Sequence, residues 1–228
     1  QMRRGIREEL YNNKYLPPPP VVPRYLRVPV EERTDFAGEI VRDVNLSDVE
    51  NGIELIKDEG VEAVAICCMH SYANDKNELL AEKKVRELLP GAYLSVSSKT
   101  LPQVRFYNRV STTVLNSAVG PILRKYLLRL TEKLRDERFK GILLIMQSNG
   151  GVTSPEAVTE LAASTLLSGP AAAPIAGIAY TSLHGENNFI TIDMGGTSFD
   201  AALIKDATPT VTTDGTVNRY ALALPMMQ

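Results

Sequence analysis

The stretch that most constrains the fold is the string DMGGTSFD at residues 193–200, which lies between two apolar runs. The runs cover residues 189–192 and 201–204, and apolar runs of this length beside turn residues are typical of strands. Between them, the adjacent Gly195 and Gly196 can take backbone angles that are closed to other residues. The string therefore predicts a strand, a tight turn and a second strand.

The same turn carries groups that suit a phosphate and a metal ion. A glycine turn lets an anion approach the main-chain N–H groups, and Thr197 and Ser198 add hydroxyl donors. Asp193 ends the first strand, where a carboxylate is costly to bury unless it is paired or faces a metal. A magnesium ion on the phosphates would give Asp193 that role. The competing interpretation is an ordinary hairpin with a Gly-Gly turn.

Composition excludes several classes of protein. The chain has 228 residues, 44% of them hydrophobic, which is enough to bury the core of one large or two small domains. A net charge of −2 gives no electrostatic reason to expect nucleic acid or an anionic membrane as a partner. No apolar run approaches the roughly 20 residues that span a bilayer.

The cysteines and the chain ends add two expectations. Cys67 and Cys68 are adjacent in an apolar run, which favours buried thiols in a reducing compartment over a disulfide or a metal site. We therefore expect a soluble cytoplasmic protein. Neither end of the sequence resembles a natural terminus, so we also expect a fragment of a larger protein.

The first half of the chain predicts alternating strands and helices, the pattern of an α/β fold. In the second predicted helix we expect the apolar side chains to face inward, namely Leu79, Leu80, Val85, Leu88 and Leu89. Ser47 is the predicted N-terminal cap of the first helix. The predicted elements are strands at 24–33, 39–44, 61–69 and 92–96 and helices at 47–60 and 77–89, with 61–69 as a central strand of a parallel sheet.

The second half begins with a long helical pattern over residues 104–138, which Gly120-Pro121 must kink or divide. A buried strand is predicted at 141–146. The predicted elements near the C-terminal end are strands at 208–213 and 218–224, joined by a hairpin turn at Asp214-Gly215.

Candidate ligand residues also occur outside the hairpin. Asn149 and Gly150 follow a predicted strand, where open α/β sheets bind ligands. Ser168 and Gly169 begin a small-residue helix, and a helix start suits the lining of a nucleotide cleft, although a buried packing helix is the competing interpretation. His70 follows the apolar run at 61–69 and is a candidate acid, base or substrate contact, against the interpretation of a structural hydrogen-bonding residue.

Several strings along the chain resemble one family. They are GVEAVAICCMHSYAN at 60–74, RVSTTVLN at 109–116, MQSNGG at 146–151, SGPAA at 168–172 and the hairpin string at 193–200. Together they resemble the hydantoinase A and 5-oxoprolinase family, which includes ATP-dependent acetone and acetophenone carboxylase subunits. The hairpin itself is similar to the second phosphate-binding hairpin of the actin, sugar-kinase and chaperone ATPase superfamily.

The resemblance implies an α/β fold that is a fragment of a two-lobed actin/sugar-kinase-like ATPase, with mixed sheets flanked by helices. Residues 1–138 would form the C-terminal part of the N-terminal lobe, and residues 139–228 the start of the second lobe. ATP and Mg²⁺ are the implied cofactors, with Asp193 at the metal and Gly195, Gly196, Thr197 and Ser198 at the phosphates. Asp200 would orient the turn or a water, and His70 would be the other catalytic residue.

The implied activity of the parent protein is ATP-dependent hydrolysis of a cyclic amide, whose carbonyl is activated by phosphorylation; residues 1–228 alone are expected to be inactive. The alternatives are an ATP-dependent ketone carboxylase subunit, an actin- or chaperone-like ATPase and a sugar kinase. The implied partners are a cyclic amide or ketone substrate and either a hydantoinase B-type subunit or further copies of the same chain, with neither nucleic acid nor a membrane.

Overall fold

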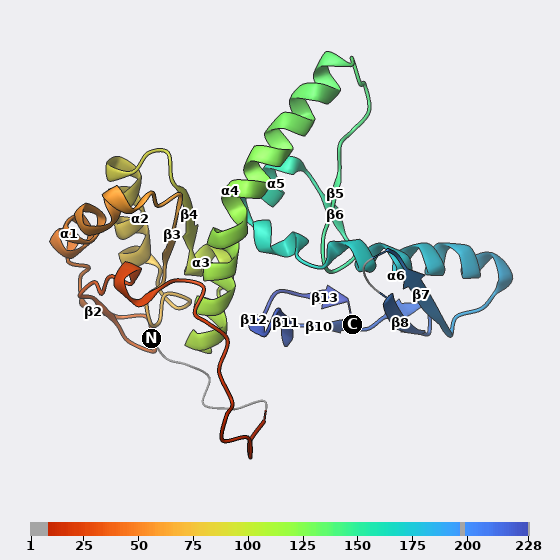
Figure 1. The fold of residues 1–228 in the computed structure, drawn as a ribbon, viewed down its shortest axis with the longest axis horizontal. Helices are drawn as coiled ribbons and strands as arrows, with labels where there is room; N and C mark the ends of the chain where they lie inside the picture. Colours follow the sequence, from red (N-terminus) through yellow and green to blue (C-terminus); the bar gives the residue numbers. More distant parts are fainter. Residues whose placement is uncertain (1–8, 197–198, 228) are drawn as a thin grey trace. The chain divides into compact units, whose positions relative to one another are not determined.

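The structure is a computed structural model that describes residues 9–196 and 199–227 (Figure 1). It divides into two compact units. Unit 1 consists of Gln1–Pro121 with Asn218–Ala221, and unit 2 of Ile122–Val217 with Leu222–Gln228. The division into lobes at residue 138 remains a prediction.

Helices and short strands alternate along the chain, as an α/β fold requires. The helices are α1 (Leu46–Ile56), α2 (Lys76–Leu88), α3 (Ser97–Thr100), α4 (Phe106–Asp136), α5 (Pro155–Glu160) and α6 (Ser168–Thr181), with 3-10 turns η1 (Arg24–Leu26), η2 (Lys57–Glu59), η3 (Ala162–Thr165) and η4 (Ser182–His184). The strands are β1 (Arg33–Thr34), β2 (Ile40–Arg42), β3 (Ala63–Ile66), β4 (Tyr93–Val96), β5 (Ile145–Met146), β6 (Val152–Thr153), β7 (Phe189–Met194), β8 (Phe199–Lys205), β9 (Thr208–Pro209), β10 (Val211–Thr212), β11 (Gly215–Val217), β12 (Tyr220–Leu222) and β13 (Met226–Met227). None of the described helices is long and apolar enough to cross a bilayer.

Unit 1 is built around a βαβ motif. β3 pairs in parallel with β4, from Ala63 opposite Tyr93 to Ile66 opposite Val96, and α2 forms the crossover between them. This parallel pair confirms the strand–helix–strand pattern, although β3 is shorter than the apolar run that predicted it. The core beside the motif contains Val44, Val49, Ile53, Ile56, Ala81 and Val85.

α1 begins at Leu46, one residue before the predicted helix, and its N-terminal cap lies two residues before the predicted cap. Asn45 is its N-terminal cap, and the side-chain oxygen of Asn45 accepts a hydrogen bond from the Ser47 backbone N–H at 3.0 Å. The helical segment ends at Gly60, whose φ of +64° suits a glycine at a helix end. The cap at Ser47 is therefore wrong by two residues, while the end at Gly60 is confirmed.

α2 buries a polar face, which contradicts the predicted orientation of its leucines. Leu79, Leu80 and Leu88 are 37%, 36% and 42% exposed. The buried residues of α2 are Asn77, Glu78, Ala81, Glu82 and Val85. Val85 is 3% exposed and lies in the apolar core, and Leu89 packs against that core, as predicted. Glu78, in contrast, meets polar groups of the segments that follow β3 and β4.

α4 continues as one helix through Pro121, which the sequence predicts to kink or divide it. Pro121 lacks the N–H that would bond one turn back, so the helix tolerates one missing hydrogen bond at this point. Gly120 is required by packing, since a Cβ there would lie 2.2 Å from the ring of Tyr93.

Unit 2 contains a three-stranded antiparallel sheet in the order β7-β8-β9. β7 and β8 form the predicted hairpin, paired from Phe189 opposite Ile204 to Met194 opposite Phe199. α6 packs on this sheet at Gly177, where a Cβ would lie 2.5 Å from Thr191 Cγ2 and 2.9 Å from Phe189 Cε2. A small residue at this point in α6 therefore permits close contact between helix and strand.

Two predicted elements in the second half of the chain differ in the structure. The strand at 141–146 is reduced to β5, which pairs antiparallel with β6, so the turn between them closes a short hairpin instead of ending a buried parallel strand. Ile142 is 84% exposed, so this apolar run is not part of the core. Near the C-terminal end the strands turn at Asn218 and Arg219, both with positive φ, and not at Asp214-Gly215.

Candidate functional site

The candidate site is the open end of the β7–β8 hairpin. Asp193 and Asp200 are direct cross-strand partners there, on the same face as Thr191. Asp193 is exposed and Asp200 is half-buried. Side chains directly opposite each other in an antiparallel pair have Cβ atoms about 4.5–5.5 Å apart, and like charges at that separation destabilise the pair. This pair of carboxylates therefore favours a bound cation.

The donor set fits magnesium held together with phosphate. Mg²⁺ typically takes one or two carboxylates and completes its shell with water and phosphate oxygens, and does not need a cage made of protein alone. Within residues 9–196 and 199–227, no three His, Cys, Asp or Glu side chains are grouped as metal ligands. Asp193 and Asp200 thus match the carboxylate contribution to such a site.

The two glycines leave the main chain of the turn open. A Cβ at Gly195 or Gly196 would meet no atom within 4 Å, and neither residue has a φ in the left-handed region. The expectation that these glycines are needed for unusual backbone angles is therefore wrong, whereas the expectation of an accessible main chain is consistent with the open surroundings. Thr197 and Ser198 lie outside the described residues.

The hairpin returns along α6 toward the beginning of that helix (Figure 1). The chain leaves α6 at Thr181, and by Phe189 and Thr191 it is again in contact with Gly177. From this contact, nine residues of helix back to Ser168 and four residues of strand on to Gly195 each cover about 13 Å. The hairpin that carries the glycine turn thus packs on α6 through β7 and β8.

The beginning of α6 has the features of an anion-binding helix start. Leu167 precedes it with φ +64°, and no side chain caps the first turn, which also contains no acidic residue. Ser168 is half-buried, and Gly169 is exposed with nothing within 4 Å of a Cβ. The first N–H groups of a helix have no partner within it and carry the positive end of the helix dipole.

The two candidate residues of the turn between β5 and β6 take part in hydrogen bonds within the turn. The Gly151 N–H donates to the Asn149 side-chain oxygen at 2.8 Å, and the Gly150 N–H donates to the Gln147 carbonyl at 3.0 Å. Gly150 has φ +81°, and a Cβ there would lie 2.2 Å from Met227 Cε. These contacts show that Gly150 has a packing role in unit 2.

Ser148 joins this turn to the segment before α6. It is 2% exposed, its N–H donates to the Ser164 carbonyl at 2.7 Å, and its hydroxyl contacts the carbonyls of Ser164 and Leu166. Because Leu166 stands two residues before α6, Ser148 fixes the segment from which that helix begins.

His70 lies in unit 1, in the turn that follows β3. Its Nδ1 is 2.9 Å from the Thr34 carbonyl, so Nδ1 carries the proton and Nε2 is the basic atom of the neutral ring. The ring makes an edge contact with Tyr72 at a centroid distance of 5.9 Å. The structural interpretation of His70 is supported by these contacts.

A buried polar cluster next to His70 is the main feature that sequence analysis missed. Arg109 and Glu78 are both 0% exposed, and Ser97 lies between them. The Ser97 hydroxyl donates to Glu78 at 2.5 Å and accepts from Arg109 Nε at 3.1 Å. Arg109 also donates to the carbonyls of Cys68 (2.5 Å), Met69 and Gln103 (2.8 Å). We refer to Glu78, Ser97 and Arg109 as the Arg109 cluster.

The Arg109 cluster holds both sides of the turn that contains His70. Glu78 accepts from the Cys68 N–H at 2.6 Å and the Ser98 N–H at 2.8 Å, and the Arg109 guanidinium stacks over Tyr72 at 5.5 Å. Burial lowers the pKa of Arg109 from its ordinary value, and the nearby Glu78 carboxylate opposes that shift. Burial also raises the pKa of Cys67 to about 12, which disfavours the reactive thiolate. Cys67 and Cys68 are free thiols, each partly exposed rather than fully buried as the sequence predicts.

Comparison with known proteins decides the family. The family model for hydantoinase/oxoprolinase matches residues 109–228, and the model for the hydantoinase/oxoprolinase N-terminal region matches residues 1–89. The chain belongs to the hydantoinase/oxoprolinase family. This confirms the resemblance drawn from the sequence strings.

Relatives of this hydantoinase/oxoprolinase chain include several enzymes. It is 33% identical to caprolactamase subunit alpha of Pseudomonas jessenii, over 100% of the chain and 33% of the relative. It is 29% identical to acetone carboxylase beta subunit of Xanthobacter autotrophicus, over 96% of the chain and 31% of the relative. It is 34% identical to 5-oxoprolinase 1 of Arabidopsis thaliana, over 73% of the chain and 13% of the relative.

Two solved structures of the family share the fold. The crystal structure of ATP-dependent caprolactamase from Pseudomonas jessenii matches with a TM-score of 0.84 and 31% identity, over 98% of this chain and 33% of that one. The nucleotide-free structure of acetone carboxylase matches with a TM-score of 0.82 and 30% identity, over 92% of this chain and 30% of that one. The α/β fold is thus confirmed, and the chain spans about a third of the length of these two relatives.

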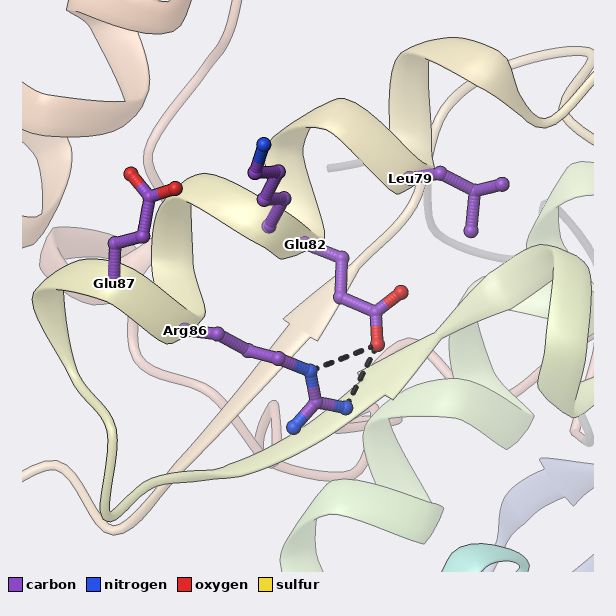
Figure 2. Close-up of a pocket in the computed structure, with 5 residues that line it drawn as sticks. Leu79, Glu82, Arg86 and Glu87 are labelled. Carbon is purple, nitrogen blue, oxygen red and sulfur yellow. Dashed lines mark hydrogen bonds and ion pairs between the residues drawn. The ribbon is translucent and has the colours of Figure 1, made fainter.

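A shallow depression of about 450 Å³ lies on α2, apart from the residues predicted to form the site (Figure 2). It is lined by Leu79, Glu82, Lys83, Arg86 and Glu87. Glu82 accepts from Arg86 Nη2 at 2.7 Å and from Lys99 at 2.6 Å. Partial burial opposes the effect, but these two hydrogen bonds lower the pKa of Glu82. The depression contains none of the predicted site residues, and its most buried charge is already paired.

Proposed function

We propose that the full-length protein containing this chain is an ATP-dependent hydrolase of cyclic amides that activates the amide carbonyl by phosphorylation. The observation that carries the proposal is the carboxylate pair Asp193–Asp200 beside an open glycine turn, in a hairpin that packs on α6. Caprolactamase and 5-oxoprolinase among the relatives act on cyclic amides by name, and the matched caprolactamase structure is named ATP-dependent.

Different candidate residues would bind the magnesium ion, the phosphates and the rest of the nucleotide. Asp193 and Asp200 would hold magnesium, directly or through water, and the bound ion would neutralise charge on the phosphates. The N–H groups of Gly195 and Gly196 and the hydroxyls of Thr197 and Ser198 would bind phosphate oxygens. Ser168 and Gly169 would add the N–H groups of the helix start, and Asn149 and Gly150 would border the nucleotide.

Phosphoryl transfer requires positioning and charge neutralisation more than a covalent side-chain step. Asp200 would also orient the turn. His70, through Nε2, would act as acid or base on the amide in the same protein. Residues 1–138 and 139–228 would then belong to two successive lobes, the second of which carries the phosphate hairpin.

The second candidate is an ATP-dependent ketone carboxylase subunit. Similarity to acetone carboxylase beta subunit and to acetophenone carboxylase gamma subunit supports it. Both of these relatives, like caprolactamase subunit alpha, are named as subunits. We therefore propose that a second subunit, of the hydantoinase B type, or further copies of the chain complete the enzyme.

The direct test is ATP hydrolysis by the full-length protein, alone and with its neighbouring subunit. We expect phosphate release to be stimulated by cyclic amides such as a lactam, hydantoin or 5-oxoproline. Stimulation only by a ketone with bicarbonate would instead assign the carboxylase function. Both proposals would be contradicted if a sugar stimulated phosphate release, or if none of the small substrates changed its rate.

Gly196→Val tests the phosphate turn without disturbing the fold. The Cβ of the new side chain enters open space, so the melting temperature of the full-length protein should remain unchanged. The branched side chain should block phosphate approach and raise the KM for ATP roughly tenfold or more. Gly91→Val is the matched control, because Gly91 also has open space around its Cβ and lies in unit 1. Equal KM values for the two variants would contradict the phosphate role.

A further inference from the structure

The turn that follows β3 is bonded at both ends to other segments of unit 1. It covers residues 68–74, and we call it the His70 turn. At its start, Arg109 of α4 donates to the carbonyls of the first two residues of the turn, the first at 2.5 Å. At its end, the Asn74 side chain donates to the Gly38 carbonyl at 2.9 Å. Since these partners are 36 to 41 positions apart in the chain, the shape of the turn depends on the folded unit and not on its own sequence.

Two further contacts fix the imidazole ring within the His70 turn. Nδ1 donates to the Thr34 carbonyl at 2.9 Å, which sets the tautomer and the orientation of the ring. The ring also makes an edge contact with Tyr72, and the Arg109 guanidinium lies 5.5 Å from the centroid of the Tyr72 ring. Arg109 therefore holds both the backbone that carries His70 and the aromatic ring that His70 contacts.

A buried charge at this place is not explained by stability alone. Arg109 and Glu78 are both 0% exposed, and taking two charges out of water has a large free-energy cost. Apolar residues of similar volume in place of a complete buried ion pair often leave a protein as stable or more stable. The guanidinium offers what apolar residues lack, namely five N–H donors in one fixed plane. Those donors set the positions of backbone carbonyls, so the Arg109 cluster favours one geometry of the His70 turn.

We infer that Arg109 is a positioning residue for the proposed reaction, and that it holds the His70 turn so that His70 Nε2 meets the amide in one orientation. This rests on the proposed function, in which His70 acts as acid or base on a cyclic amide. Arg109 itself is fully buried, so it acts through the turn and does not touch the substrate. Proton transfer needs heavy atoms within about 2.6–3.2 Å of each other, and a misplacement of about 1 Å can lower a rate roughly 100-fold. A looser turn should therefore lower kcat, while the KM for ATP, whose proposed site is in unit 2, stays the same.

The test is steady-state phosphate release by the full-length protein with its neighbouring subunit, measured over a range of ATP concentrations with caprolactam or 5-oxoproline as the probe. The variants are Arg109→Lys, His70→Gln and the double variant, each assayed below its melting temperature. Arg86→Lys is the matched control, because Arg86 donates to Glu82 and its own side chain is 59% exposed. We expect kcat to fall roughly tenfold or more in Arg109→Lys and roughly 100-fold or more in His70→Gln. The KM for ATP should be unchanged in both, and Arg86→Lys should keep the wild-type kcat.

The double variant separates positioning from a general structural role. If Arg109 acts through His70, the kcat of the double variant should equal that of His70→Gln, whereas independent effects would multiply. Multiplied losses, or a wild-type kcat in Arg109→Lys beside a slow His70→Gln, would overturn the inference and leave the proposed function intact. A cyclic-amide activity that is absent from the wild type, or unchanged in His70→Gln, would contradict the proposed function or the role of His70 in it, and the inference would fall with it.

Ser97→Ala decides the question if Arg109→Lys does not fold. It removes only the hydroxyl that joins Arg109 Nε, at 3.1 Å, to the Glu78 carboxylate. A fall in kcat that disappears in the His70→Gln background would support the inference, and a wild-type kcat would overturn it.

Discussion

Replacing Asp193 by Asn in the full-length protein is expected to lower magnesium-dependent ATP turnover roughly 100-fold or more without lowering the stability of the metal-free protein. The loss of turnover follows from removing one of the two carboxylates proposed to hold the ion. The retained stability follows from the register, which places Asp193 directly opposite Asp200. Removing one of two opposed like charges relieves repulsion, so the melting temperature without magnesium should stay the same or rise.

The two measurements separate a metal-binding role from a structural one. Asp214→Asn is the control, because it removes the same charge from an exposed position of unit 2 outside the hairpin. Its turnover should equal that of the wild type. If Asp193→Asn melted at a clearly lower temperature, Asp193 would be a structural partner in the turn. Wild-type turnover in a folded Asp193→Asn protein would remove the basis of the proposed site.

The hairpin was predictable because its determinants are local. Strand, turn and strand all lie within residues 189–205, and the pairing requires only that the chain fold back on itself at the glycines. The pairing of Asp193 with Asp200 is different, because register depends on how many residues the turn uses, which a Gly-Gly pair leaves open. The sequence therefore predicted the position of the turn and both aspartates, but not that Asp193 and Asp200 are direct cross-strand partners.

The polar face of α2 was not predictable from its own sequence. Its leucines suggest an apolar inner face, yet Glu78 and Asn77 are fully buried while Leu79 and Leu80 are partly exposed. What buries Glu78 is the set of N–H and hydroxyl groups supplied by Cys68, Ser97 and Ser98. Those residues lie ten to twenty positions away in the chain, beyond the reach of helical periodicity.

The string RVSTTVLN is one of the five that together resembled the family, and the structure explains its polar composition. Arg109, Thr112, Thr113 and Asn116 are each 0% exposed on the inner face of α4. Thr113 donates to the Arg109 carbonyl at 2.7 Å, and Asn116 donates to the Ser95 hydroxyl at 2.9 Å. A helix that buries this many polar groups needs hydrogen-bonding partners placed at matching positions.

Arg109 should therefore be the most costly single residue to remove from unit 1. In residues 1–228, we expect Arg109→Met to lower the free energy of unfolding by about 3–5 kcal/mol, the cost of removing one member of a buried charged network. The variant leaves the carbonyls of Cys68, Met69 and Gln103 without their donor, and it leaves the buried Glu78 carboxylate without the nearby positive charge. Urea denaturation followed by circular dichroism measures the change.

Arg86→Met is the matched control for this prediction. Arg86 also donates to a carboxylate, Glu82, but its own side chain is 59% exposed, so its loss should cost no more than about 1 kcal/mol. The loss of unfolding free energy in Arg109→Lys should fall between those of the two Met variants. Lysine keeps the positive charge, but its ammonium group cannot bond to three carbonyls and Ser97 as the planar guanidinium does. If Arg109→Met and Arg86→Met had the same urea midpoint, the Arg109 cluster would not stabilise unit 1. If Arg109→Met lost the full amount of about 3–5 kcal/mol in unfolding free energy while Arg109→Lys had wild-type stability, the positive charge alone would hold the turn that contains His70. The planar arrangement of donors in the guanidinium would then not be needed.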